Sequence, residues 1–200
     1  MKKLLTAILC VTVCLSFSGC CMLYDYECNA VGGFDVGYSE ILNDAFLSCY
    51  LWDGTEEKAS LVLPEEYSGI PITSLGGYYG RGVPCYFGIE LTESAKSKLC
   101  DKSGEWFATS STNLLVMADS ITAIKTIKFN VHVGKNIEKI ELNGLDYCFG
   151  CEYTEDGTEC CEVFIFSYHF TCDEKNKTFY AKDGKLYYKK DGALVEGISY

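Results

Sequence analysis

Basic side chains are scarce in this sequence. Its 200 residues include 17 lysines and arginines against 28 aspartates and glutamates, which gives a formal net charge of −11, and Arg81 is the one arginine. Nucleic-acid binding needs clustered lysines and arginines, and an acidic chain repels the phosphate backbone. Nucleic acid is therefore not an expected partner.

Proline is also scarce, with 3 residues against 19 glycines, 15 tyrosines and 11 phenylalanines. Aromatic residues favour strands, and glycines favour the turns between them. The hydrophobic content of 48% excludes a disordered chain. We expect one mainly β domain.

The motifs of common enzymes and cofactor sites are missing. The sequence contains no G-x-S-x-G, no H-E-x-x-H and no phosphate-binding G-K-[ST]. His132 and His169 lie in expected strands and are interpreted as surface or strand histidines, and the acidic runs 53–57 and 152–159 as solvated turns without a calcium-ligand spacing. We expect no cofactor and no catalytic residue; an enzyme would need one of these histidines beside a cysteine or carboxylate.

The N-terminus has the pattern of an export signal. Lys2 and Lys3 precede an apolar run from Leu4 to Phe17, which is shorter than the roughly 18 to 20 residues of a membrane-spanning helix. The following Phe17-Ser-Gly-Cys20 resembles a bacterial lipobox, in which the cysteine receives a diacylglycerol thioether. The resemblance implies a signal peptide at 1–19, lipidation of Cys20 and anchoring to a membrane outside the cytoplasm; plain secretion is the alternative.

An internal repeat follows the expected tether at 20–36. Segments 115–124 and 131–140 share the pattern apolar, any, apolar, small, any, any, Ile, any, any, Ile. The stretch Leu61–Leu75 joins them if a five-residue loop is inserted after Pro64. Each unit predicts a short strand, a turn and a second apolar pair, and stacked units of this kind bury one another in a solenoid.

These residues resemble a known family. "LVLPEEYSGIPITSLGG" and "VHVGKNIEKI" are similar to repeat units of BspA-type leucine-rich repeat surface proteins, and residues 172–195 are similar to the segment that closes such arrays, through Asn176, Tyr180, Asp183, Gly184, Leu186 and Tyr187. The resemblance implies an irregular leucine-rich-repeat-like solenoid over 37–200 with a C-terminal β-hairpin cap. The family's "A-F-x-x-C" segment is absent, and 84–112 fits no repeat.

The C-terminal tyrosines allow a second interpretation. Asp183-Gly184 and Asp191-Gly192 predict tight turns in a β-meander. The same hairpins resemble aromatic cell-wall-binding repeats, in which Tyr180, Tyr187 and Tyr188 would be carbohydrate platforms. A plain hairpin cap is the simpler interpretation.

Four cysteines form a local cluster, Cys148-x-x-Cys151 and Cys160-Cys161. They are compatible with a zinc site, but an exported chain favours disulfides or free thiols. Pairing is not set by the sequence. The sequence thus predicts a lipid-anchored surface recognition or adhesion protein without enzymatic activity, bound to an unknown protein or glycan, with cell-wall or carbohydrate binding as the alternative.

Overall fold

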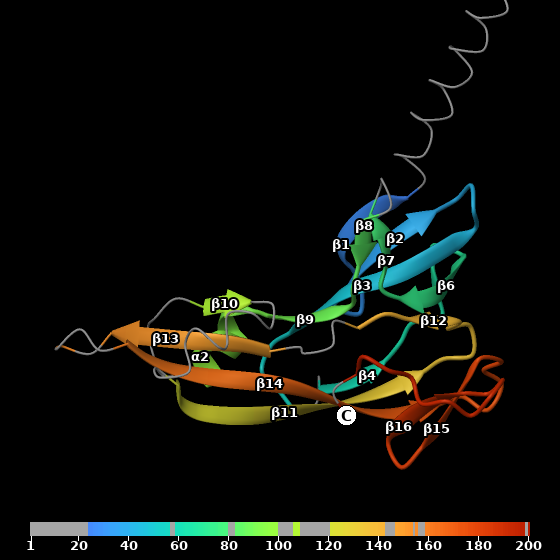
Figure 1. Ribbon diagram of the computed structural model, residues 1–200. Helices are drawn as coiled ribbons and strands as arrows, with labels where there is room; N and C mark the ends of the chain where they lie inside the picture. The colour runs from blue at the N-terminus through green and yellow to red at the C-terminus, as the bar shows by residue number, and fades with distance from the viewer. Residues whose placement is uncertain are drawn as a thin grey trace, which may run out of the picture.

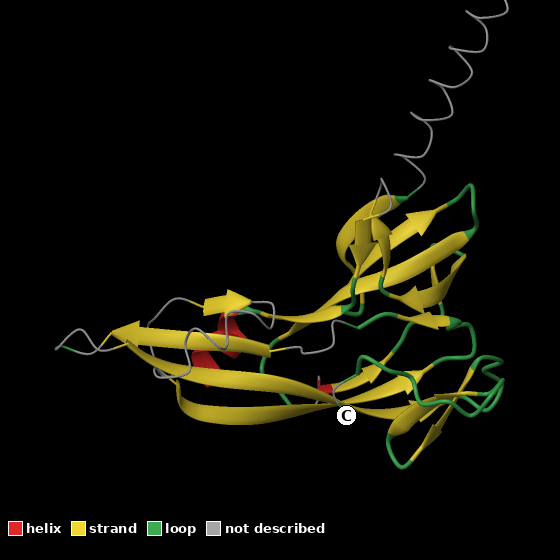
Figure 2. Ribbon diagram, viewed as in Figure 1, coloured by secondary structure: helices red, strands yellow, loops and turns green. Residues whose placement is uncertain are grey.

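The computed structural model describes residues 24–56, 59–79, 83–99, 106–108, 121–142, 147–153, 155, 159–198 and 200. Strands dominate this part of the chain, which confirms the mainly β prediction (Figure 2). The strands form mixed sheets, with parallel and antiparallel neighbours in the same sheet.

Seven of the described strands form the first sheet. Its main path is β1 (Asp25–Val31), β2 (Phe34–Ser39), β3 (Asp44–Trp52), β6 (Ile70–Leu75) and β12 (Lys139–Ile140), with β5 (Glu66–Tyr67) beside β6 and β9 (Gly88–Leu91) beside β3. Val36 is fully buried and Phe34 is 3% exposed. The expected tether at 20–36 is therefore wrong from residue 25 onward, because these residues pair as strands and supply core side chains.

Five of the described strands form the second sheet, in the order β10 (Trp106–Ala108), β13 (Tyr147–Tyr153), β14 (Glu159–Cys172), β11 (Ile121–Val133) and β4 (Ser60–Val62). Figure 1 shows it as the elongated lower layer, with the first sheet above one end. Buried residues alternate along β11 at Phe129, Val131 and Val133, as expected for a strand with one face in the core. Trp52 of the first sheet packs edge-on against Phe129, at 5.2 Å between ring centroids.

Three smaller elements complete the described fold. Helix α2 (Glu93–Leu99) begins where the Thr92 hydroxyl accepts a hydrogen bond from the Ala95 amide. The strands β7 (Gly77–Tyr79) and β8 (Val83–Cys85) form a short pair. The hairpin of β15 (Phe179–Lys182) and β16 (Lys185–Tyr188) packs on the end of β14, where the Phe170 amide donates to the Gly184 carbonyl at 2.8 Å (Figure 1).

Two of the three predicted repeat segments lie side by side in the predicted alignment. Leu61 of β4 is the parallel partner of Val131, and Leu75 of β6 is the parallel partner of Ile140. Each segment therefore gives one strand to each sheet. The loop inserted after Pro64 is the β5–β6 hairpin, whose turn residues Ser68 and Gly69 both have positive φ.

The third predicted segment, 115–124, differs from the other two. Its first part lies outside the described residues, and 121–124 belong to β11, the strand that continues to Val133. In the other two segments the second apolar pair crosses to the first sheet, whereas Ile124 stays in the second sheet and is 60% exposed. Along the described part of this segment, the repeat pattern does not predict the path of the chain.

Candidate functional site

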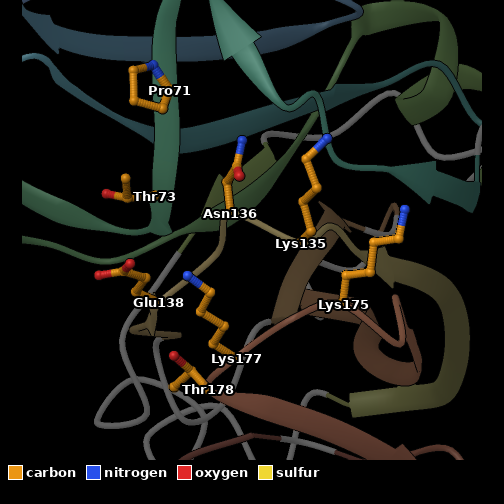
Figure 3. A pocket seen from close by; sticks show the side chains of 8 residues that line it. All are labelled: Pro71, Thr73, Lys135, Asn136, Glu138, Lys175, Lys177 and Thr178. Carbon is orange, nitrogen blue, oxygen red and sulfur yellow. The ribbon is translucent and has the colours of Figure 1, made fainter.

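Among the described residues, one candidate ligand site is a cavity of about 430 Å³ lined mainly by polar and charged residues, within the range of about 300 to 1,000 Å³ of small-molecule sites. We call it the lysine groove. Figure 3 shows its lining residues, which come from three segments: Pro71 and Thr73 of β6; Lys135, Asn136 and Glu138 of the turn between β11 and β12; and Lys175, Lys177 and Thr178 of the turn between β14 and β15.

Asn176 holds two of these segments together. It is 1% exposed, and its amide nitrogen donates to the carbonyls of Gly134 and Ile137 at 2.8 and 2.9 Å. Its side-chain oxygen accepts from the amides of Thr178 and Phe179 at 2.8 and 2.7 Å. One buried side chain thus satisfies four backbone groups and fixes the turn that carries the lysines.

Hydrogen bonds and one ion pair attach the chain at residues 65–73, which includes the start of β6, to the turn at residues 135–138. The Glu138 amide donates to the Thr73 carbonyl at 2.6 Å. The side-chain nitrogen of Asn136 donates a hydrogen bond to the backbone carbonyl of Glu65 at 3.2 Å. The Lys135 ammonium forms an ion pair with the Glu65 carboxylate at 2.5 Å. These bonds place the 135–138 turn between the other two segments of the lysine groove.

The lysine groove concentrates positive charge in an acidic protein. Lys135 is neutralised by Glu65, and the hydrogen bond to that carboxylate raises the pKa of the Lys135 ammonium. The ammonium groups of Lys175 and Lys177 have no carboxylate partner within the part of the chain that the structure describes. Glu138 is the one carboxylate among the lining side chains.

A second cavity of about 310 Å³ adjoins the lysine groove and shares Thr73 and Glu138 with it. Asp44 organises this part, accepting hydrogen bonds from the hydroxyls of Tyr24 at 2.8 Å and Thr73 at 2.5 Å. Burial, followed by the hydrogen bond to Asp44, raises the pKa of Tyr24 to about 12. The adjoining cavity therefore carries a neutral phenol beside an acidic group.

The structure divides the three predicted tyrosines between two faces of the β15–β16 hairpin. Tyr180 and Tyr187 are direct cross-strand partners, and their rings stack at 5.3 Å with an interplanar angle of 19°. Tyr188 is paired with Phe179 on the opposite, core-facing side. Tyr180 and Tyr187 form one partly exposed aromatic pair, and Tyr188 is not part of it.

The first predicted turn of this region is confirmed, whereas the second is a longer loop over residues 189–192 in which Gly192 but not Asp191 has positive φ. Asp183 and Gly184 both have positive φ and join Lys182 to Lys185 as a two-residue hairpin turn. The chain then returns antiparallel to β16, where Leu194 pairs with Tyr187.

The cysteine cluster is described only in its backbone. The β13–β14 register places Cys151 opposite Cys161, and Cys160 opposite Glu152. Their side chains lie outside the part of the chain that the structure describes, so the alternatives of zinc binding, disulfides and free thiols stay predictions.

The remaining cysteines give no metal site among the described residues. There, no His, Cys, Asp and Glu side chains group so that they could hold a metal ion. Cys28, Cys49, Cys85 and Cys172 are free thiols, and burial raises the pKa of Cys49 and of Cys172. Cys20 lies outside the described residues, so its lipidation stays a prediction.

Both histidines lie in strands, as predicted. His132 of β11 shares a hydrogen bond of 3.0 Å with the Thr171 hydroxyl of β14. His169 of β14 packs against Gly184, where a Cβ atom would collide with its ring. Neither histidine lines the lysine groove.

The sequence interpretation missed every residue that lines the lysine groove. A signal was present, because Phe170–Phe179 repeats the spacing of Val131–Ile140 with Phe170, Cys172 and Phe179 at apolar positions. The structure pairs Val131 with Phe170 and Val133 with Cys172 in parallel. Extending this alignment would have placed Lys175 beside Asn136 and Lys177 beside Glu138.

Within the described ranges, no helix has the length and apolar character needed to cross a membrane. No family model, curated protein or solved structure is significantly similar to this chain.

Proposed function

We propose that this protein is an exported, lipid-anchored surface recognition protein without enzymatic activity, and that the lysine groove is its ligand-binding site. The observation that carries the proposal is the lysine groove itself, a cavity that three chain segments line mainly with polar and charged side chains, and two of these segments are held together by the four hydrogen bonds of Asn176. Fixed turns favour binding, because the backbone that carries the lysines loses little freedom when a ligand enters.

The repeat interpretation belongs to the same proposal. We regard residues 61–75, 131–140 and 170–179 as three degenerate units of a leucine-rich-repeat-like array. The parallel pairing of β4, β11 and β14 at Leu61, Val131 and Phe170 supports this view. The hairpin β15–β16 covers the last unit, and the turns of the second and third units supply six of the eight groove residues.

A binding array tests the recognition function. The full chain, expressed with its own leader and purified from membranes in detergent, is applied to glycans and extracellular-matrix proteins. We expect at least one ligand whose binding falls in the Lys175→Gln/Lys177→Gln variant. The control is Lys128→Gln/Lys182→Gln, which removes the same charge from exposed positions outside the groove. If both variants bind like the wild type, the groove is not the recognition site.

Metabolic labelling with a palmitate analogue tests the anchor. We expect incorporation in the wild type and its loss in Cys20→Ala, because the thioether forms on that sulfur. Cys21→Ala is the matched control, since it removes the neighbouring thiol and leaves the lipobox-like residues 17–20 intact. Unchanged labelling of Cys20→Ala would contradict lipid anchoring at this residue.

A second candidate function is carbohydrate binding by the aromatic pair Tyr180 and Tyr187. Their near-parallel rings favour it, because sugar rings stack on flat aromatic surfaces. Titration with neutral oligosaccharides, followed by tyrosine fluorescence, should then show binding that is lost in Tyr187→Ala. Equal binding by that variant would exclude the pair as the site.

A further inference from the structure

The charged and neutral polar groups of the lysine groove restrict the chemical class of ligand that it can bind. Lys175 and Lys177 supply ammonium groups without a carboxylate partner among the described residues, and Lys135 supplies one already paired with Glu65. Neutral donors and acceptors come from Thr73, Asn136 and Thr178, and the remaining lining residues are Pro71 and Glu138.

We propose that the lysine groove binds an acidic saccharide whose sugar units carry a carboxylate, such as a uronic acid. This inference rests on the proposed recognition function and names its ligand class. A uronic acid offers one carboxylate for a lysine ammonium and several hydroxyl groups for the neutral side chains of the groove. Charge-assisted hydrogen bonds from ammonium to carboxylate supply the strongest contacts of such a site.

Lys175 and Lys177 are the primary carboxylate contacts. Both side chains are exposed, and neither is committed to a described acidic partner, so each can turn toward a ligand without breaking an ion pair. Lys135 is less available because it is held at 2.5 Å from Glu65. Figure 3 shows Lys177 below Asn136 and Lys175 to the lower right of Lys135; both belong to the turn between β14 and β15.

The neutral residues and Glu138 contact the sugar hydroxyls. The Thr73 hydroxyl donates a hydrogen bond to Asp44, and its oxygen can still accept a hydrogen bond from the ligand. Asn136 donates to the Glu65 carbonyl, which leaves its side-chain oxygen as an acceptor. Glu138 accepts hydrogen bonds from hydroxyls and repels every anion in proportion to its charge, so the groove suits a sugar unit with one carboxylate better than one that carries several anionic groups.

An acidic peptide fits the lining less well. Peptide sites bury apolar side chains in pockets or add a strand to an open sheet edge. Pro71 is the one apolar residue among the eight that line the groove. The carbonyl of Ile137, beside the two-residue strand β12, is already engaged by Asn176.

The test compares two ligands that differ only in charge. The full chain in detergent is titrated with trigalacturonate and with its fully methyl-esterified form, by isothermal titration calorimetry at low and high salt. We expect the acid to bind at least about tenfold tighter than the ester, because the ester removes the carboxylates and keeps the sugar rings. The affinity should also fall with added salt, since the lysines are exposed.

The variants locate the site. Lys175→Gln/Lys177→Gln should lose about tenfold in affinity for trigalacturonate, while Lys128→Gln/Lys182→Gln should match the wild type. A circular-dichroism melt checks that both variants fold alike. Equal binding of acid and ester, or equal affinity of the two variants, overturns the proposal.

Two further outcomes separate this inference from the proposed function. If a hexaglutamate peptide binds the groove tighter than trigalacturonate does, the saccharide inference fails and the groove remains a recognition site. If the array described above yields no ligand that depends on Lys175 and Lys177, the proposed function fails and the saccharide inference fails with it.

Discussion

The lysine groove and the tyrosine pair are both suited to ligands, but they are assembled in different ways. The tyrosine pair is local, since Tyr180 and Tyr187 face each other across one hairpin. The lysine groove joins β6, the 135–138 turn and the 175–178 turn, which are far apart in the sequence. The tyrosine pair depends only on the register of one hairpin, whereas the groove depends on how the sheets and two separate turns are placed.

Asn176→Ala should have the largest effect, because the groove depends on this side chain. The substitution leaves four buried or partly buried backbone groups without partners, at a cost of about 3 kcal/mol or more in the free energy of unfolding. Urea denaturation measures the loss. Groove-dependent binding should decrease as well, while the Tyr180–Tyr187 hairpin keeps its register.

Asn130→Ala is the matched control for this prediction. Asn130 lies on β11 with an exposed side chain. We expect its removal to change the unfolding free energy by no more than about 0.5 kcal/mol. If the two alanine variants are equally stable, Asn176 does not hold the turns together.

Two glycine substitutions compare the hairpin that carries the tyrosines with the hairpin that leads into the groove. Gly184 and Gly69 both follow a residue with positive φ in a two-residue turn, and both have positive φ themselves. Gly184→Ala adds a collision with His169, whereas a Cβ at Gly69 meets no atom within 4 Å. We expect a loss of about 1 kcal/mol for Gly69→Ala from the backbone alone.

For Gly184→Ala we expect the free energy of unfolding to fall by about 2 to 3 kcal/mol, because the hairpin must also shift away from β14. Thermal unfolding of both variants measures the difference. Equal losses would mean that the His169 contact does not hold the hairpin against the second sheet.

The sequence predicted the local features and missed most of the non-local ones. Asp183-Gly184 specifies its own turn, because an Asp-Gly pair tolerates positive φ wherever it occurs. One non-local feature was also anticipated, since the repeated apolar spacing aligned Leu61 with Val131, and the structure pairs these two residues. Residues 25–36 were mistaken for a tether, since their burial depends on β3 and on core residues much later in the chain.

The groove residues were missed for a related reason. Nothing in the sequence distinguishes Lys175 and Lys177 from other surface lysines. They lie in the groove only because β14 pairs beside β11, which brings the turns after these strands together. The asparagine that positions them, Asn176, was noticed as part of a family resemblance. Its hydrogen bonds to the carbonyls of Gly134 and Ile137 could not be predicted from the sequence, because these residues are far away in the chain.

Alkaline pH should destabilise both regions through one tyrosine in each. Burial raises the pKa of Tyr24, beside the groove, and of Tyr200, at the hairpin, to about 12 from the ordinary 10. Between these values the folded state retains protons that the unfolded state has lost, so stability falls as pH rises from about 10 to 12. Both phenols are partly exposed, so we expect each of them to lower the free energy of unfolding by only about 1 kcal/mol over this pH range.

Phenylalanine variants separate the two contributions. Tyr24→Phe and Tyr200→Phe should each reduce the loss of unfolding free energy between pH 9 and about 12. Urea midpoints at several pH values provide the measurement. Tyr180→Phe is the control, and an equal change in that variant would show that the alkaline effect is general rather than a property of these two sites.

The smallest expected effect, from Tyr180→Ser, decides between the two surfaces. Losing one ring of a cross-strand aromatic pair costs about 0.5 to 1 kcal/mol, because the second ring remains on the hairpin. Affinity for trigalacturonate should be unchanged, since Tyr180 does not line the lysine groove. Titration of this variant beside the wild type is the measurement. A clear loss of affinity would move the saccharide site from the lysines to the tyrosine pair, because the two surfaces share no residue.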